Sequence, residues 1–132
     1  MALVGCGKKT PAAEPETKAE SKASAKKPTP PKASTNTLGM KFVPVPGTGV
    51  AFCIWETRVK DYAAYAAANA GVDGSWKKPY FSEENYMQEE THPVVEVSWN
   101  DAQAFCAWLT KKELAAGIIK AGQKCRLPTD AE

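Results

Sequence analysis

The sequence predicts a small domain that mixes helices with strands and follows a segment that cannot form a core. Residues 40–46 and 50–55 alternate apolar with other side chains around a glycine-bearing loop, which is typical of a β-hairpin. Residues 98–117 repeat apolar side chains at helical spacing. All twelve aromatic side chains follow Lys41, so only the later part of the 132-residue chain can build a packed core.

The charge of the chain is divided between these two parts. Residues 7–36 hold seven Lys and three Glu, whereas residues 37–132 hold ten basic and twelve acidic side chains. The formal net charge of +2 is therefore the sum of +4 in the early segment and −2 in the later part. This balance argues against a nucleic-acid-binding protein. No run approaches the roughly 18 apolar residues that a membrane span needs.

Residues 1–6 end in Leu3, Val4, Gly5 and Cys6, a stretch that is similar to a bacterial lipobox. We therefore expect residues 1–6 to be a truncated lipoprotein signal, with the true start of the protein upstream and Cys6 as the lipidated residue. One acyl chain beside a basic spacer would hold the protein at a membrane surface, outside the cytoplasm. The alternative interpretation is that Cys6 is an ordinary thiol.

Residues 7–36 are predicted to be a disordered linker. They contain seven Lys and five Pro, and their only other apolar side chain is Ala. Proline favours extended chain, the lysines repel one another, and too little apolar surface is present to offset the loss of chain entropy on folding.

The predicted hairpin opens the domain, which extends over residues 37–132. Pro44 and Pro46 lack amide donors, so the first strand is expected at the edge of a sheet.

A short helix is predicted over residues 59–68. Thr57 is the expected N-cap, and Asn69 with Gly71 is expected to end the helix. Its buried face is predicted to contain Val59, Tyr62, Ala63 and Ala66, at positions i, i+3, i+4 and i+7.

Residues 71–91 form a long irregular stretch whose aromatic side chains are expected to pack on the domain. Its carboxylates invite a calcium interpretation, but they lack the compact alternation of oxygen ligands around a glycine turn that a dedicated calcium loop shows. A solvated charge run is favoured. The carboxylates concerned are Glu83, Glu84, Glu89 and Glu90.

A short buried strand is predicted over residues 94–97, and the best helix of the chain follows it. Ser98 is the expected N-cap and Asp101 occupies the capping-box position. Gly117 is expected to close this helix. Its apolar face is predicted to contain Ala102, Phe105, Cys106 and Leu109, with Lys111, Lys112 and Glu113 facing water.

The last residues form a second capping box. Thr129 and Glu132 have the Thr-x-x-Glu spacing and follow Pro128, which indicates the start of a further helix. We therefore expect the chain to be a fragment that is incomplete at its C-terminus.

With these elements assigned, the domain resembles the N-terminal part of the formylglycine-generating enzyme family, also called the sulfatase-modifying factor family. The last two of the four matching stretches are the more specific ones. The stretches are residues 38–47, residues 55–59, residues 92–94 with 97–102, and residues 126–132.

The resemblance implies an irregular α+β fold that is C-type-lectin-like and has little regular secondary structure. Active members of the family oxidise a sulfatase cysteine to formylglycine with oxygen and copper, and they also bind structural calcium. The resemblance places the copper cysteines and the calcium site in later parts of the domain, so we assign no catalytic, cofactor-binding or metal-binding residue to this chain. The expected partner is a sulfatase-like polypeptide. The alternative is a non-catalytic, lectin-like module that binds an unknown ligand or serves as a scaffold.

Three cysteines remain in the domain, and none forms a C-x-x-C pair. Core packing is the favoured interpretation of Cys53, Cys106 and Cys125. A disulfide between two of them is the alternative, which an extracytoplasmic location would permit.

His92 is the only histidine, and we expect it to be hydrogen-bonded inside a turn. Arg126 is expected to be partly buried and paired with a carboxylate. The tryptophans Trp55, Trp99 and Trp108 are predicted to be core aromatics.

Overall fold

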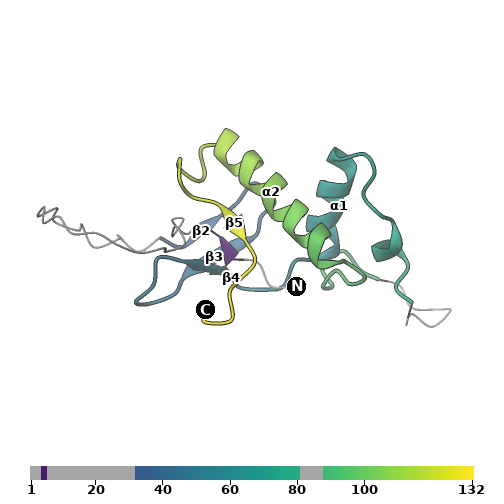
Figure 1. Cartoon of the computed structure of the whole chain (residues 1–132), viewed down its shortest axis with the longest axis horizontal. Coiled ribbons are helices and arrows are strands. Elements are labelled where there is room, and N and C mark those ends of the chain that lie inside the picture. The colour runs from purple at the N-terminus through teal and green to yellow at the C-terminus, as the bar shows by residue number, and fades with distance from the viewer. Residues whose placement is uncertain (1–3, 6–31, 81–87) are drawn as a thin grey trace, which may run out of the picture.

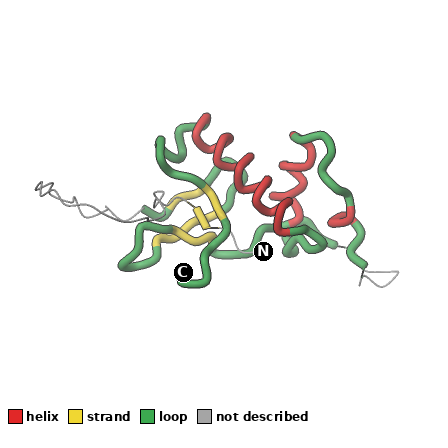
Figure 2. The backbone as a smooth tube through the Cα atoms, in the orientation of Figure 1, coloured by secondary structure: helices red, strands yellow, loops and turns green. Residues whose placement is uncertain are grey.

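The computed structural model describes residues 4–5, 32–80 and 88–132, and it shows a mixed α+β architecture. A small antiparallel sheet lies at one side, and α2 crosses between this sheet and α1 (Figures 1 and 2). The helices are α1 (Val59–Ala68), the short 3₁₀ helix η1 (Ser75–Lys77) and α2 (Trp99–Ala115). The strands are β1 (Val4–Gly5), β2 (Ser34–Thr35), β3 (Lys41–Pro44), β4 (Ala51–Cys53) and β5 (Cys125–Arg126).

The strands follow the order β2-β3-β4-β1-β5 in the sheet, and every neighbouring pair is antiparallel. The predicted hairpin is confirmed as β3 and β4, in which Phe42 lies opposite Cys53 and Pro44 lies opposite Ala51. Gly47 adopts a φ of 77° in the connecting turn, a conformation that favours glycine.

The prediction that the first strand of the hairpin lies at a sheet edge is wrong. β2 pairs with β3 and takes the edge position itself. This pairing is possible because it uses Lys41 and Phe42, whereas the proline that lacks an amide donor stands at the far end of β3, at Pro44.

Two strands of the sheet lie in the predicted signal, residues 1–6, and the predicted linker, residues 7–36. Ser34–Thr35 forms β2, so the prediction of disorder does not hold for the end of residues 7–36. Val4–Gly5 forms β1, which lies between β4 and β5. Residues 6–31, including Cys6, lie outside the described residues, so lipidation of Cys6 stays a prediction.

The first helix, α1, has the predicted bounds but a different N-cap. Arg58 takes the cap position, and the carboxylate of Asp61 accepts from its backbone amide and its guanidinium. Thr57 is fully buried, and its carbonyl accepts from the amide of Val94 over 2.9 Å. The predicted end is confirmed, since Asn69 is the C-cap and donates to the carbonyl of Tyr65.

The second helix, α2, begins as predicted. The Ser98 hydroxyl accepts from the amide of Asp101 over 3.2 Å, and Gly117 follows the helix with a φ of 70°. The predicted apolar face is confirmed, because its four members are all buried. Glu113 is an exception to the predicted polar face, since it is only 1% exposed.

An aromatic cluster joins the two helices and forms the centre of the core. Tyr62 packs against Phe105 and Trp76 with ring centroids 5.8 and 5.5 Å apart. Tyr65 packs edge-on against Phe105 at 5.6 Å and beside Trp108 at 5.5 Å. Such contacts stabilise beyond the burial of apolar area alone.

The long irregular stretch packs on the core at Trp76, whereas Tyr80 is 94% exposed, and residues 81–87 lie outside the described residues. The predicted strand over residues 94–97 is wrong. Val94 is buried, but Glu96 has a φ of 56°, which interrupts extended backbone. None of the helices in the described part is long and apolar enough to span a bilayer.

Candidate functional site

A groove runs between α2 and the segment that starts at Lys124. Its volume is about 830 Å³, and it is open to solvent. The wall formed by α2 contains Trp99, Gln103, Cys106, Ala107, Thr110 and Lys111. The opposite wall contains Lys124, Cys125, Arg126, Leu127, Pro128, Thr129 and Glu132.

Thr110 joins the two walls of the groove. Its hydroxyl donates to the carbonyl of Cys106 over 2.8 Å and accepts from the amide of Cys125 over 2.9 Å. A hydroxyl can both donate and accept, so this one side chain connects the helix with the neighbouring strand.

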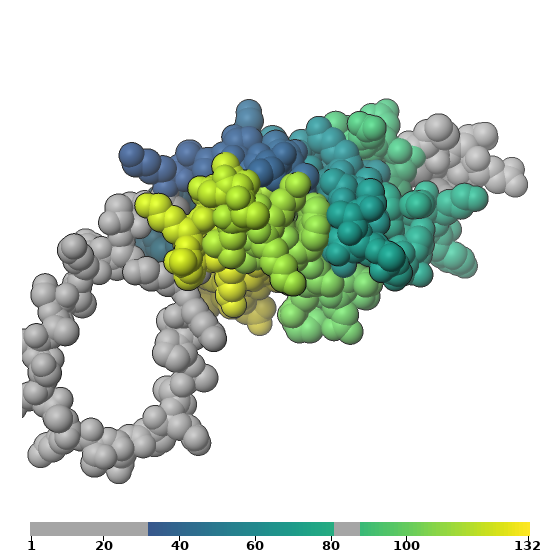
Figure 3. Space-filling model, turned by 90° about the horizontal axis from the view of Figure 1, so that it is seen from above, coloured from purple at the N-terminus to yellow at the C-terminus, as the bar shows by residue number. Residues whose placement is uncertain are grey.

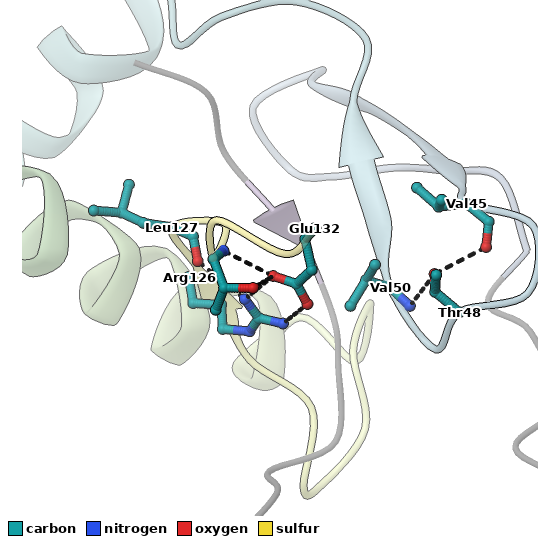
Figure 4. A network of polar contacts seen from close by, with 7 residues as sticks. Val45, Thr48, Val50, Arg126, Leu127 and Glu132 are labelled. Atoms are coloured by element: carbon teal, nitrogen blue, oxygen red, sulfur yellow. Dashed lines mark hydrogen bonds and ion pairs between the residues drawn. The ribbon is translucent and has the colours of Figure 1, made fainter.

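Arg126 and Glu132 form an ion pair in the C-terminal wall (Figure 4). The guanidinium Nη1 donates to Glu132 Oε2 over 2.6 Å, and Nη2 donates to the other carboxylate oxygen. Thr129 adds its backbone amide, which donates to Oε2 over 2.9 Å. Hydrogen bonds from Arg126 first, and then from Thr129, lower the pKa of Glu132 to about 2. The predicted pairing of Arg126 with a carboxylate is therefore confirmed. One of the two hydrogen bonds of the predicted capping box is present, from the Thr129 amide to the Glu132 carboxylate.

The groove presents a surface suited to binding. Trp99 is 67% exposed at one end, so the prediction that it is a core aromatic is wrong. It occupies the first position of α2 and lies outside the core cluster. Trp108 packs against the core, as predicted. Lys111 and Lys124 add positive charge beside the apolar side chains. The groove can therefore contact an apolar or anionic group.

Acid–base chemistry is not evident in the groove among the described residues. Burial raises the pKa of the Cys106 thiol to about 12, which keeps the sulfur protonated and a poor nucleophile at neutral pH. The carboxylate of Glu132 already accepts hydrogen bonds from Arg126 and Thr129.

His92 lies in a turn away from this groove. Its Nδ1 accepts from the amide of Glu89 over 3.3 Å, and its carbonyl accepts from the amide of Val59 over 2.9 Å. The prediction of a hydrogen-bonded histidine inside a turn is confirmed.

The cysteines of the domain pack as predicted. Cys106 and Cys125 are buried in the core cluster, and Cys53 is half-buried against it on β4. Burial also raises the pKa of the Cys53 thiol. No disulfide joins these three residues in the described part of the chain.

Two buried carboxylates were missed by sequence reasoning. Glu113 accepts from the backbone amide of Thr37 over 3.2 Å and from its hydroxyl, which attaches the start of the domain to α2. Figure 3 shows the same contact region, where the end of α2 adjoins the segment before residue 50. Asp61 is 1% exposed and binds Arg58, whose guanidinium lies 4.3 Å from the ring centre of Trp55. The Arg58–Asp61 spacing of a capping box was the available signal for the second case.

The described residues do not fit a metal centre. No group of three or more His, Cys, Asp or Glu side chains among residues 4–5, 32–80 and 88–132 could hold a metal ion. Copper(I) prefers thiolate ligands, whereas Cys106 is held as a thiol. Accordingly, we assign no step of any reaction to a metal at these residues.

Comparisons with known proteins identify what this arrangement belongs to. The family described as "Sulfatase-modifying factor enzyme 1-like domain" matches residues 20–132. The formylglycine-generating enzyme of Mus musculus is 36% identical over 78 residues, which are 58% of this chain and 17% of that protein. The enzyme of the same name from Bos taurus is 36% identical over 58 residues, which are 44% of this chain and 12% of that protein.

A bacterial relative gives the same result. The formylglycine-generating enzyme of Streptomyces coelicolor is 37% identical over 57 residues, which are 43% of this chain and 14% of that protein. The matches thus span less than a fifth of the length of these relatives. The comparison with solved structures gave no match. The family match covers most of the chain, including α1, α2 and both walls of the groove. This chain therefore belongs to the sulfatase-modifying factor family.

Proposed function

We propose that the protein containing this chain oxidises a cysteine of a sulfatase-like polypeptide to formylglycine. In this proposal, residues 37–132 supply the N-terminal part of a domain with a C-type-lectin-like fold. The observation that carries the proposal is the family match over residues 20–132, together with three relatives that share the name formylglycine-generating enzyme.

The chain's own residues have a structural and binding role in this proposal. Thr110 holds α2 against β5, and Arg126 holds the segment that ends at Glu132. The family's copper and calcium belong to later parts of the domain, and bound copper supplies the activation of oxygen there. The described residues bind neither ion in this proposal.

A non-catalytic, lectin-like binding module or scaffold is the second candidate. The observation that favours it is the groove. Its lining includes the exposed Trp99 and the lysines Lys111 and Lys124, and burial keeps the Cys106 thiol protonated. Such a surface suits recognition of a ligand more than proton transfer.

A peptide oxidation assay distinguishes the two candidates. The complete gene product that includes this chain is loaded with copper and incubated in air with a sulfatase-derived peptide that contains its cysteine. The oxidase proposal predicts an aldehyde on that residue, detected by mass spectrometry after trapping with hydroxylamine. The matched control peptide carries serine in place of cysteine and should give no aldehyde. If the copper-loaded protein leaves the cysteine peptide unchanged, the oxidase proposal fails and the binding module remains.

We also propose that Cys6 carries a lipid and anchors the protein outside the cytoplasm. The support is the Leu3–Cys6 match to a lipobox and the Lys- and Pro-rich stretch that follows it. Mass spectrometry of the gene product from bacterial membranes tests this proposal, with a Cys6→Ser variant as the control. An unmodified Cys6 in membrane-derived protein would contradict it.

A further inference from the structure

The wall of the groove formed by α2 carries an exposed stripe of side chains. The members of the stripe recur every four residues and all line the groove: Trp99, Gln103, Ala107 and Lys111. An α-helix rises about 1.5 Å per residue, so Trp99 and Lys111 lie about 18 Å apart along the axis. The stripe therefore has an aromatic end and a basic end, separated by the length of about five extended residues.

Two lysines, Lys111 and Lys124, lie near each other at the basic end. Each is the sequence neighbour of one partner in a hydrogen bond between the walls, in which the amide of Cys125 donates to the Thr110 hydroxyl over 2.9 Å. Both lysines line the groove and are exposed. Within the described residues neither lysine forms an ion pair, so an anion at this end would relieve the repulsion between the two charges.

The lining also contains a carboxylate, and its charge is already balanced. Glu132 accepts hydrogen bonds from the guanidinium of Arg126 and from the amide of Thr129. The lining therefore keeps the positive charge of its two lysines. Elsewhere the domain is not basic, because residues 37–132 hold ten basic and twelve acidic side chains. The positive charge is thus local to one end of the groove, which does not suit the wide phosphate contacts of a nucleic acid.

The lining between the two ends leaves room for an extended ligand. It includes the small side chain of Ala107 on α2 and the apolar side chains of Leu127 and Pro128 on the opposite wall. A small inorganic anion would contact only the basic end. A peptide in extended conformation can contact the basic end, the apolar middle and the aromatic end at the same time.

We propose that this groove binds an extended segment of a partner polypeptide that carries carboxylates at one end and an aromatic side chain about five residues away. The carboxylates lie against Lys111 and Lys124, and the aromatic side chain packs on the exposed ring of Trp99. This assignment rests on the binding role of the groove given above and is independent of the oxidase activity.

Fluorescence anisotropy with labelled peptides tests the proposal on the complete gene product, without copper. The probe is the peptide Glu-Glu-Ala-Ala-Ala-Phe, and its reverse sequence is measured as well, because the groove defines the spacing of the groups and not the chain direction. We expect one of the two to bind with a dissociation constant below about 1 mM and to bind more weakly as salt is added. The matched control peptide has glutamine in place of both glutamates and should bind at least about tenfold more weakly.

Charge reversal locates the binding site on the protein. Lys111→Glu and Lys124→Glu should each weaken binding of the acidic peptide by about tenfold. Trp99→Ala should weaken binding of both the acidic peptide and the glutamine peptide. Lys60→Glu is the matched control, because Lys60 is exposed on α1, outside the groove, and the substitution changes the net charge equally. It should leave the affinity unchanged.

Several outcomes would overturn the proposal. They are the absence of saturable binding, equal affinity for the acidic and glutamine peptides, and an equal loss of affinity in Lys60→Glu. A single-stranded oligonucleotide of the same charge that binds as tightly as the acidic peptide would also overturn it, because the groove would then be a general anion site. The comparison of the two peptides uses the unsubstituted protein, so it is decisive even if a variant fails to fold. Because no copper is present, these results leave the oxidase proposal to its own assay.

Discussion

At the scale of single residues, the ion pair between Arg126 and Glu132 gives the protein an acid-dependent stability. The folded-state pKa of Glu132 is about 2, below its ordinary value of 4.5. Because the pKa is depressed, the pair contributes its full stability above about pH 4.5 and loses it as the pH falls toward 2. We expect Glu132→Gln to remove this part of the pH dependence, measured by urea unfolding across that range. The loss at neutral pH should be no more than about 1 kcal/mol, because the pair is partly exposed to solvent. Identical pH profiles of the two proteins would contradict this account.

Glu113 is the residue whose loss should affect the start of the domain most. Its carboxylate is buried and accepts from the amide and hydroxyl of Thr37. Glu113→Ala removes a buried carboxylate that accepts two hydrogen bonds, so we expect the free energy of unfolding to fall by about 2 kcal/mol. Lys111→Ala, an exposed change on the same helix, is the control and should alter stability by no more than about 0.5 kcal/mol. Equal effects of the two substitutions in chemical unfolding would show that the buried contact contributes little.

At the scale of elements, the packing of α1 against α2 depends on the aromatic cluster. Phe105 is fully buried and contacts both tyrosines of α1. Phe105→Ala should therefore cost about 3–5 kcal/mol of stability, because it removes a large buried side chain and leaves a cavity. Trp99→Ala at the exposed start of the same helix should have a much smaller effect. Thermal unfolding of the two variants checks this ranking, and a larger loss for Trp99→Ala would refute it.

At the scale of the whole molecule, the sheet extends beyond the predicted domain boundary. Residues 37–132 alone lack β1 and β2. In this shortened chain β4 loses its pairing with β1, and β3 loses its pairing with β2. We expect this shortened chain to melt broadly, at a lower temperature than residues 1–132, because β4 and β5 lose their shared neighbour. Circular dichroism melting of both chains provides the comparison. A sharp, cooperative melt of residues 37–132 would contradict this expectation.

Local sequence patterns determined the helices, the hairpin and the family. Helix starts and ends follow from side chains that bind their own neighbouring backbone, as Ser98 and Asp101 do, and such interactions are visible within a few residues. The apolar spacing of α2 likewise identified its buried face, including Cys106. The four family stretches led to the same family as the comparisons.

Only the tertiary structure decided what lies between distant segments. Three such contacts join residues that are well separated in sequence. They are the contact of Thr37 with Glu113, the placement of Val4–Gly5 between β4 and β5, and the hydrogen bond from Cys125 to Thr110. No periodicity reports such contacts, because they depend on how elements pack after they form. The same reason explains Trp99, whose type suggested the core but whose position at the start of α2 leaves it at the rim of the groove. Sequence therefore determined the elements and the family of this protein, and packing determined the groove.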